Sequence, residues 1–213
     1  MANINVIVIG ASGYTGAELI RLLLEHPLVT IKALVADSNA GKDMAEIYPH
    51  HIASKLPRLQ KLDEVDLASA DAVFMCMPHA MAHEIAKTIP KNVKIIDVSA
   101  DFRIQDIALY EKWYGTHKAP ELQKEAVYAL TEIYREKIRN ARIIACPGCY
   151  TTSILLPVLP LIAAGAIDEN DIIADSKSGA TGAGRGAKQN LLFTEVNDGI
   201  GAYALGGHRH SAE

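Results

Sequence analysis

The chain has 213 residues, with 21 Lys and Arg against 25 Asp and Glu, which gives a formal net charge of −4. Hydrophobic residues make up 49% and charged residues 22% of the sequence, as in soluble globular proteins. This mildly acidic balance lacks the basic surface of a nucleic-acid-binding protein, and no apolar stretch approaches the roughly 18 residues of a membrane span. Three cysteines are too few for a disulfide framework. The composition therefore predicts a cytoplasmic protein with neither nucleic acid nor membrane as its partner.

Strand-like and helix-like segments alternate over the first two thirds of the chain. Residues 4–9 (INVIVI) are a β-branched run, typical of a strand buried on both faces of a parallel sheet. The leucine spacing that follows predicts a helix over residues 14–26, opened by a capping box of Thr15 and Glu18. Further strands are predicted at residues 29–35, 72–76, 93–98 and 142–145, a helix at 79–88, and a long loop at 37–58. This alternation predicts an α/β fold with a Rossmann-type, doubly wound parallel sheet.

The sequence changes in character after Ala145, where we expect a boundary between domains at residues 1–145 and 146–213. An apolar segment follows Cys149 and extends to Ala164. Pro157 and Pro160 within it predict a kink or a break in any helix there. Residues 172–176 are predicted to form a short strand, and eight of the 15 glycines fall between Gly179 and Gly207.

A glycine-rich loop lies between the first predicted strand and the first predicted helix. Glycines 10, 13 and 16 have the spacing GxxGxxG, which allows a tight turn and lets backbone N–H groups approach a pyrophosphate at the helix N-terminus. After the second strand, Asp37 has the spacing of an acid that takes the ribose hydroxyls of NAD. Ser38 and Lys42 could instead receive the 2′-phosphate of NADP. Position alone leaves both cofactors open, and a solvated polar loop remains a third interpretation.

Cys146-Pro147-Gly148-Cys149 permits three interpretations. A second CxxC is lacking, so a zinc site is disfavoured, and the surroundings do not match a thioredoxin-like redox pair. In the third interpretation Cys149 is a nucleophile, because it begins a helix-like segment and a helix N-terminus stabilises a thiolate. Such a cysteine needs an imidazole from elsewhere in the chain. The pair His79 and His83 lacks the glutamate of an HExxH site, so we predict no metal.

Three further segments carry groups suited to an anionic ligand. His208 and His210 flank Arg209, which suits proton transfer and anion binding, although a polar surface turn is the plain alternative. The tract from Ser178 to Arg185 offers backbone N–H groups for an anion or for the carboxamide end of a cofactor, or it is a flexible loop. Ser99 and Arg103 follow a strand, where open α/β sheets bind ligands. Arg103 is thus a candidate carboxylate clamp, or a partner in a surface salt bridge.

Together these motifs resemble the N-acetyl-γ-glutamyl-phosphate reductases, relatives of aspartate-semialdehyde dehydrogenase. The resemblance spans the whole chain and is carried by GASGYTGAEL, SNAGK, DVSADFR, PGCY, SGATGAGR and GHRH. It implies NADPH-dependent reduction of N-acetyl-glutamyl 5-phosphate to N-acetyl-glutamate 5-semialdehyde in arginine biosynthesis. In this chemistry Cys149 expels phosphate from the substrate and forms a thioester.

The resemblance also implies roles for individual residues. His210 is favoured for proton exchange with Cys149, and His208 for substrate contact, although spacing does not separate the two. NADP(H) is implied as the cofactor, with residues Gly10, Ser12, Gly13, Tyr14, Thr15, Gly16, Ser38, Lys42, Pro78, Ser178 and Gly179 around it. The implied substrate contacts are Ser99, Arg103, Gly148, Arg185 and Arg209.

Two departures from the family pattern stand out. Thr151 replaces a proline found in many relatives, with no expected consequence for the chemistry. The chain ends at Glu213, whereas relatives continue beyond HRH. We therefore expect a complete nucleotide domain followed by the incomplete start of an α+β catalytic domain through which the protein forms a homo-oligomer. An inactive nucleotide-binding fragment and a related acyl-phosphate reductase are the alternatives.

Overall fold

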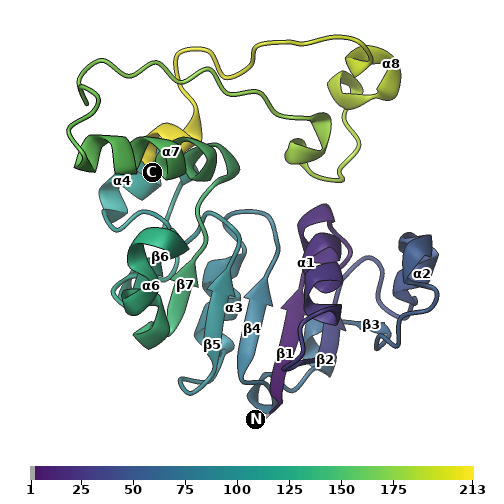
Figure 1. Cartoon of the computed structure of the whole chain (residues 1–213). Coiled ribbons are helices and arrows are strands. Elements are labelled where there is room, and N and C mark those ends of the chain that lie inside the picture. The colour runs from purple at the N-terminus through teal and green to yellow at the C-terminus, as the bar shows by residue number, and fades with distance from the viewer. Residues whose placement is uncertain (1–2) are drawn as a thin grey trace.

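The computed structural model describes residues 3–213, and its centre is one parallel sheet (Figure 1). The seven strands follow the order β3-β2-β1-β4-β5-β7-β6. Their bounds are β1 Ile4–Ile9, β2 Val29–Val35, β3 Leu59–Gln60, β4 Ala72–Met75, β5 Lys94–Asp97, β6 Ala126–Tyr128 and β7 Ile143–Ala145. Every strand pair is parallel. The predicted doubly wound α/β sheet is confirmed.

Helices cover both faces of this sheet. Their bounds are α1 Tyr14–Leu24, α2 Met44–Ile47, α3 Ala82–Thr88, α4 Ile107–Tyr114, α5 Pro120–Gln123, α6 Thr131–Asn140, α7 Cys149–Ala163 and α8 Phe193–Val196. Val6 and Val8 of β1 pack in one core with Ile20 of α1, whereas Ile7 and Ile9 pack in a second core with α3. Alternate residues of one strand thus face opposite layers, as the β-branched run predicts.

Several predicted elements differ from those in the structure. Helix α1 begins at Tyr14 with Gly13 as its N-cap and no side-chain cap, so the capping box of Thr15 and Glu18 is absent. Glu18 instead pairs with Arg21 at 2.6 Å. The glycine loop needs residues 10–13 for its turn, and the helix therefore starts too early for Thr15 to cap it.

Helix α7 runs unbroken from Cys149 to Ala163 through both prolines. Pro157 and Pro160 lie on its exposed side, where water can reach the carbonyl groups that proline leaves without a donor. The predicted break was wrong for this reason, whereas the predicted kink stays a prediction. The predicted strand at 172–176 is also absent, since the segment has no strand partner among residues 3–213 and Ile173 is 92% exposed.

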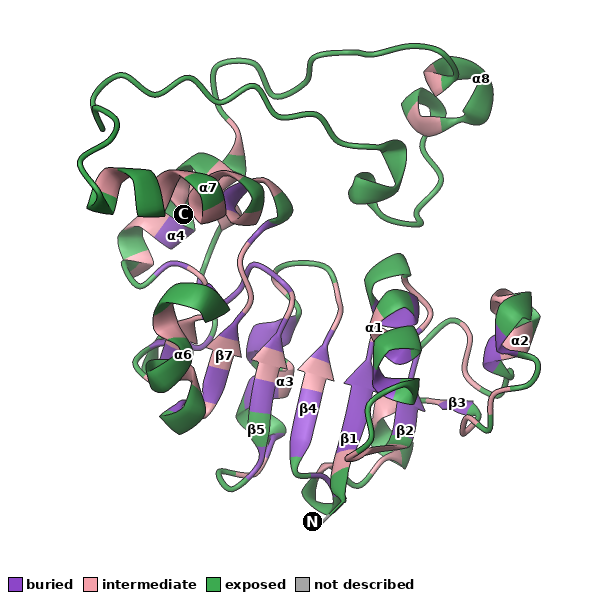
Figure 2. Cartoon of the chain, viewed as in Figure 1, coloured by how far each residue is buried: buried purple, intermediate pink, exposed green. Residues whose placement is uncertain are grey.

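Residues 165–206 form a long excursion above the carboxyl ends of the strands (Figure 1). Figure 2 shows this excursion to be almost wholly exposed, in contrast to the buried sheet below it. Its exposed side chains include large apolar ones, among them Phe193, Ile200 and Leu205. Among residues 3–213, no helix has both the length and the apolar character to cross a bilayer.

Candidate active site

The candidate site lies at the carboxyl ends of the parallel strands, in the loops that follow them. Strand β1 is central, with β2 on one side and β4 on the other. The sheet therefore has its topological switch point between β1 and β4, where open α/β sheets bind nucleotides. The predicted glycine loop follows β1, Pro78 follows β4, Ser99 and Arg103 follow β5, and Cys149 follows β7.

The turn from β1 into the first turn of α1 needs glycine at two positions for different reasons. Gly10 has a φ of +82°, and a Cβ there would lie 2.2 Å from the carbonyl oxygen of Cys76 after β4. A Cβ on Gly16 would lie 2.4 Å from the carbonyl oxygen of Gly10, so this glycine lets α1 approach the loop. The first-turn amides of α1, at Tyr14, Thr15 and Gly16, have no acceptor within the helix. They form a cradle that fits a pyrophosphate.

Polar side chains from a second loop meet this cradle. Asn39 donates to the hydroxyl of Ser12 at 3.3 Å, and Lys42 donates to Asn39 at 3.1 Å. Tyr48 donates its hydroxyl to the carbonyl oxygen of Ser12 at 3.1 Å. Ser38, Lys42 and Asp37 are all exposed beside it. Hydrogen bonds through Asn39 thus connect Ser12, predicted to contact the pyrophosphate, to Lys42, predicted to contact the ribose phosphate.

Arg185 lies with this nucleotide loop and not with Cys149. Its guanidinium is 5.4 Å from the ring centroid of Tyr48 and 3.5 Å from the carbonyl oxygen of Ser12. The resemblance implies a substrate contact for Arg185, whereas this position favours a contact with the cofactor. Ser178 and Gly179 lie in the exposed excursion, where the Ser178 hydroxyl bonds to the Gly179 carbonyl.

Cys149 is the first residue of α7 and is exposed. It therefore stands at the positive end of the helix dipole, as the sequence predicts. His210 packs against the preceding residue, because a Cβ on Gly148 would lie 2.5 Å from His210 Nε2. Burial lowers the pKa of the His210 imidazole, an effect that Glu213 opposes. A neutral imidazole is thus brought beside the backbone that carries Cys149.

His208 occupies a different position, among aromatic rings. Its ring centroid is 5.4 Å from that of Tyr150 and 5.6 Å from that of Tyr203. Its Nδ1 accepts the backbone N–H of His210 at 3.1 Å, and the hydroxyl of Tyr203 donates to that of Tyr150 at 2.9 Å. This arrangement makes His208 a support for the His210 turn.

Three residues predicted to touch substrate already have partners within the chain. Ser99 is 5% exposed, and its hydroxyl accepts the backbone N–H of Asp101. Arg103 donates to the carbonyl oxygens of Cys146 and Val98, at 2.7 and 3.2 Å, and forms an ion pair with Glu213. The backbone N–H of Gly148 donates to Glu213 at 2.9 Å. These groups hold the loop in place, and the amide of Gly148 is not free for an oxyanion.

Arg209 is exposed and reaches toward the loop after β4. Its Nη1 is 3.1 Å from the imidazole of His79, and its guanidinium is 5.4 Å from the ring centroid of Tyr114. Pro78 is exposed next to His79. The HRH segment therefore contacts both the cysteine loop, through His210, and a nucleotide-side loop, through Arg209.

The two other cysteines are largely buried, as are His51, His83 and His117, whereas His26 and His50 are exposed. Burial raises the pKa of Cys76 to about 12 and that of Cys146 to about 11. His83 is fully buried and packs on His117, with ring centroids 4.0 Å apart. Within residues 3–213 no group of three or more His, Cys, Asp or Glu side chains could hold a metal ion.

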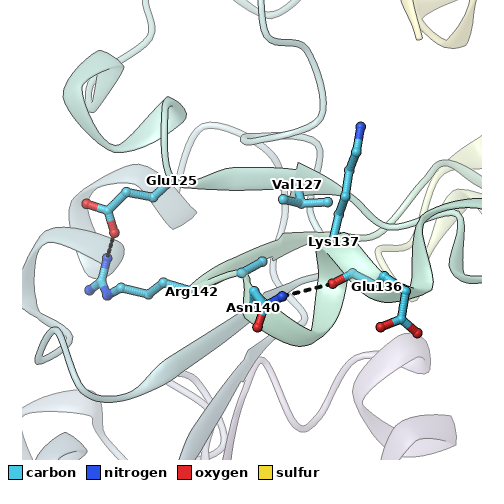
Figure 3. A pocket seen from close by; sticks show the side chains of 7 residues that line it. Glu125, Val127, Glu136, Lys137, Asn140 and Arg142 are labelled. Carbon is cyan, nitrogen blue, oxygen red and sulfur yellow. Dashed lines mark hydrogen bonds and ion pairs between the residues drawn. The ribbon is translucent and has the colours of Figure 1, made fainter.

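A surface pocket of 680 Å³ lies elsewhere, between β6, α6 and the start of β7. Figure 3 shows its lining, in which Glu125 and Arg142 form an ion pair at 2.9 Å. None of the predicted site residues lines it, so its size alone does not indicate function.

Sequence reasoning missed several side chains that complete the site. Tyr48, Tyr203 and Glu213 all contact predicted residues. Glu213 follows His210 by three residues, the spacing of neighbours on one side of a helical turn, and this was the one available signal. The two tyrosines come from loops without a periodic pattern.

Comparisons with known proteins identify the family of the chain. A family model described as the semialdehyde dehydrogenase NAD-binding domain matches residues 5–141, and one described as the semialdehyde dehydrogenase dimerisation domain matches residues 149–213. A probable chloroplastic N-acetyl-gamma-glutamyl-phosphate reductase from Oryza sativa is 53% identical over 99% of this chain and 51% of its own length. The N-acetyl-gamma-glutamyl-phosphate reductase of Cereibacter sphaeroides is 51% identical over 98% of this chain and 62% of its own. The chain thus spans about half to three fifths of these relatives.

Two solved structures that share this fold are aspartate semialdehyde dehydrogenases. The Vibrio cholerae enzyme II complexed with ASA has a TM-score of 0.57 and 20% identity, covering 77% of this chain and 44% of its own. The Candida albicans enzyme with NADP has a TM-score of 0.55 and 20% identity, covering 77% and 48%. At 20% identity, these two similarities support only the assignment of the fold. Since the NAD-binding model by itself matches well over half of the residues, the chain belongs to the semialdehyde dehydrogenase family.

Proposed function

We propose that the protein reduces N-acetyl-γ-glutamyl phosphate to N-acetyl-glutamate 5-semialdehyde with NADPH, in arginine biosynthesis. The observation that carries this proposal is the placement of Cys149 at the start of α7 with His210 against Gly148. Relatives at 53% and 51% identity bear the name of that reductase. The proposal includes a homo-oligomer formed through residues 146–213, the second of two domains, because the model that matches there is described as a dimerisation domain.

The chain's own residues account for the chemistry at sulfur. His210 accepts the thiol proton, and the Cys149 sulfur bonds to the acyl carbon while the C–O bond to phosphate breaks. A bound nicotinamide cofactor supplies hydride to the thioester carbonyl. His210 then returns its proton to the developing oxyanion. When the C–S bond breaks, His210 takes that hydroxyl proton again and passes it to the sulfur, so the Cys149 thiol is restored and the aldehyde leaves. One proton and one hydride are consumed, and inorganic phosphate is released.

Cofactor choice follows from the loop after β2. The glycine cradle and the α1 amides fit the pyrophosphate, while Ser38 and Lys42 stand exposed where a 2′-phosphate would lie. Arg185 adds a second cation on the same side through its contact with Ser12. Asp37, next to Ser38, is a carboxylate in that loop that would repel the phosphate, whereas the loop's other aspartate, Asp43, pairs with Arg58 at 3.2 Å. Two cations against one anion favour NADP over NAD.

Location in the cytoplasm is also part of this proposal. The composition and the three unpaired cysteines fit a reducing compartment. The rice relative is described as chloroplastic, so location varies among relatives and calls for a test by fractionation.

Replacement of the nucleophile tests the reaction. NADP⁺ reduction is followed with N-acetyl-glutamate 5-semialdehyde and phosphate, the reverse direction. Cys149→Ala should abolish turnover and leave NADP binding intact. Cys146→Ala is the matched control from the same loop, and it should retain activity, since burial keeps that thiol protonated. Full activity in Cys149→Ala would overturn the nucleophile assignment.

A second candidate is nucleotide binding without turnover. It is favoured by the exposure of residues 171–190, which include Ser178 and Gly179. Calorimetric titration with NADP and NAD separates the two functions, because this candidate predicts tight nucleotide binding with no reduction of NADP⁺. Tighter binding of NAD than of NADP would overturn the cofactor assignment, and Lys42→Ala should weaken NADP binding more than NAD binding.

A further inference from the structure

Asp101 is a fully buried carboxylate in the loop that follows β5. Its Oδ1 accepts the backbone N–H of Ala80 at 2.6 Å and the hydroxyl of Tyr110 at 3.0 Å. Its Oδ2 accepts the backbone N–H of Ala82 at 2.8 Å. Hydrogen bonds to a buried carboxylate are strong and directional. Asp101 therefore ties the loop between β4 and α3 to helix α4.

The bonds to the β4–α3 loop hold a strained turn. Ala80 has a φ of +67°, a left-handed conformation that residues with a side chain seldom adopt. Asp101 binds the N–H of this residue and that of Ala82, where α3 begins. A strained conformation persists only where its surroundings fix it. Since His79 directly precedes Ala80, the same carboxylate sets the position of the His79 imidazole.

The bond to Tyr110 leads through helix α4 to the same place. The ring of Tyr110 stacks on that of Tyr114, with centroids 5.2 Å apart. The guanidinium of Arg209 lies 5.4 Å from the Tyr114 ring centroid, within the range of a cation–π contact. Both ring nitrogens of His79 are 3.1 Å from Nη1 of that guanidinium, and the rings of His79 and Tyr114 meet edge to face. His79 and Tyr114 thus form a seat for Arg209, and both lead back to Asp101.

The charges in this seat suit an arginine that binds an anion. Desolvation lowers the pKa of His79, Arg209 lowers it further, and Asp101 raises it. A neutral imidazole can accept a hydrogen bond from the guanidinium, and burial likewise keeps Tyr114 in its neutral form by raising its pKa. The seat therefore orients Arg209 without neutralising it, and the guanidinium stays exposed.

We propose that Asp101 is a positioning residue for Arg209. Through the turn at Ala80 it places His79, through Tyr110 it places Tyr114, and these two rings hold the guanidinium ready for an anionic group of the substrate. This inference rests on the proposed function, because it takes Arg209 as a contact to the carboxylate or the phosphate of that substrate. The competing explanation is that Asp101 only stabilises the fold.

The position of His79 is tested by NMR titration of its ring C–H, without any ligand. Asp101→Asn should raise the pKa of His79 toward the ordinary value of about 6.5, because the imidazole moves away from the Arg209 cation. Loss of the anion alone, with His79 still in place, would lower that pKa. A lowered or unchanged pKa in the folded variant would therefore overturn the inference. Asp106→Asn is the matched control, since this carboxylate caps α4 without touching the seat, and it should leave the pKa of His79 unchanged.

The hold on an anion is tested by protection of Cys149 from iodoacetamide, followed by mass spectrometry. Inorganic phosphate and N-acetyl-glutamate are used separately, so that the two anionic groups are distinguished. For the probe that Arg209 binds, Arg209→Gln should raise the concentration for half protection about tenfold. Asp101→Asn should raise it about threefold, because an arginine without its seat must be immobilised on binding. An unchanged value in folded Asp101→Asn would contradict the inference.

A milder variant covers loss of folding in Asp101→Asn. Tyr110→Phe removes one hydroxyl and no charge, and it should move both readouts in the same direction by a smaller amount. If it moves neither, the inference fails. Arg209→Gln tells the two proposals apart: if protection by both probes is unchanged in this variant, or absent from the wild type, Arg209 contacts no anion and this inference fails. The loss of turnover in Cys149→Ala would still support the reductase.

Discussion

Gly10→Ala tests whether the β1–β4 switch point depends on the absence of a side chain. Two glycines with almost the same φ allow a matched comparison: Gly10 has a φ of +82° and Gly41 a φ of +86°. A Cβ at Gly41 would meet nothing within 4 Å, whereas one at Gly10 would lie 2.2 Å from the Cys76 carbonyl oxygen. The two substitutions therefore share a conformational cost and differ in the steric one.

The magnitudes follow from these distances. A left-handed conformation costs a residue with a side chain about 1–2 kcal/mol, and a less flexible unfolded chain offsets about 0.4–1 kcal/mol of that. Gly41→Ala should therefore lower the free energy of unfolding by about 0.5–1 kcal/mol. Gly10→Ala must also push the loop away from the backbone after β4, and overpacking of this kind costs about 1–3 kcal/mol. Its total should be about 2–4 kcal/mol.

Urea unfolding followed by far-UV circular dichroism measures both values by linear extrapolation. Gly10→Ala should also weaken NADP binding, because the displaced loop carries the pyrophosphate cradle. Gly41→Ala should leave that cradle in place. Equal losses of unfolding free energy in the two variants, within about 0.5 kcal/mol, would show that the contact between Gly10 and the Cys76 carbonyl group does not affect stability.

Two further predictions follow from buried groups near the site. Burial raises the pKa of Asp97 to about 6 from 3.8, so its contribution to stability is complete below about pH 4 and is lost as the pH rises through 6. Asp97→Asn should remove a decline of up to about 3 kcal/mol in unfolding free energy between these pH values, and an unchanged urea-unfolding profile against pH would contradict it. Iodoacetamide at pH 8 should label Cys149 and spare Cys76 and Cys146 in the native protein, as peptide mass spectrometry would reveal. Equal labelling of all three would refute this selectivity.

The sequence predicted the strands that are long and β-branched, and failed where structure depends on distant partners. Residues 4–9 are apolar on both faces, so their pattern alone identifies a buried parallel strand. Strand β6 has three residues, Ala126–Tyr128, and exists because it bonds to β7. Such a segment is too short to show periodicity. The expected strand at 172–176 has the right composition but lacks a partner among the described residues.

Prediction of the candidate site shows the same contrast between local pattern and distant partners. The glycines and Cys149 could be proposed as site residues because each is tied to a local element, the start of α1 or of α7. Arg103 and Ser99 were also placed at the correct strand end, but their partners are internal. Local sequence identifies which groups reach an edge of the sheet. It does not show which of them already bind one another, because that depends on contacts between residues far apart in the chain.

Arg103 shows why this distinction matters for substrate recognition. The sequence predicts a carboxylate clamp, and the guanidinium does bind a carboxylate, that of Glu213, 110 residues away. Since the pair is buried and the arginine's other donors bond to backbone carbonyls, a substrate anion would have to displace Glu213 to reach it. Arg209 is exposed between His208 and His210, and its cation needs no such exchange. Substrate discrimination in this site should therefore respond to Arg209, while Arg103 governs the loop that presents Cys149.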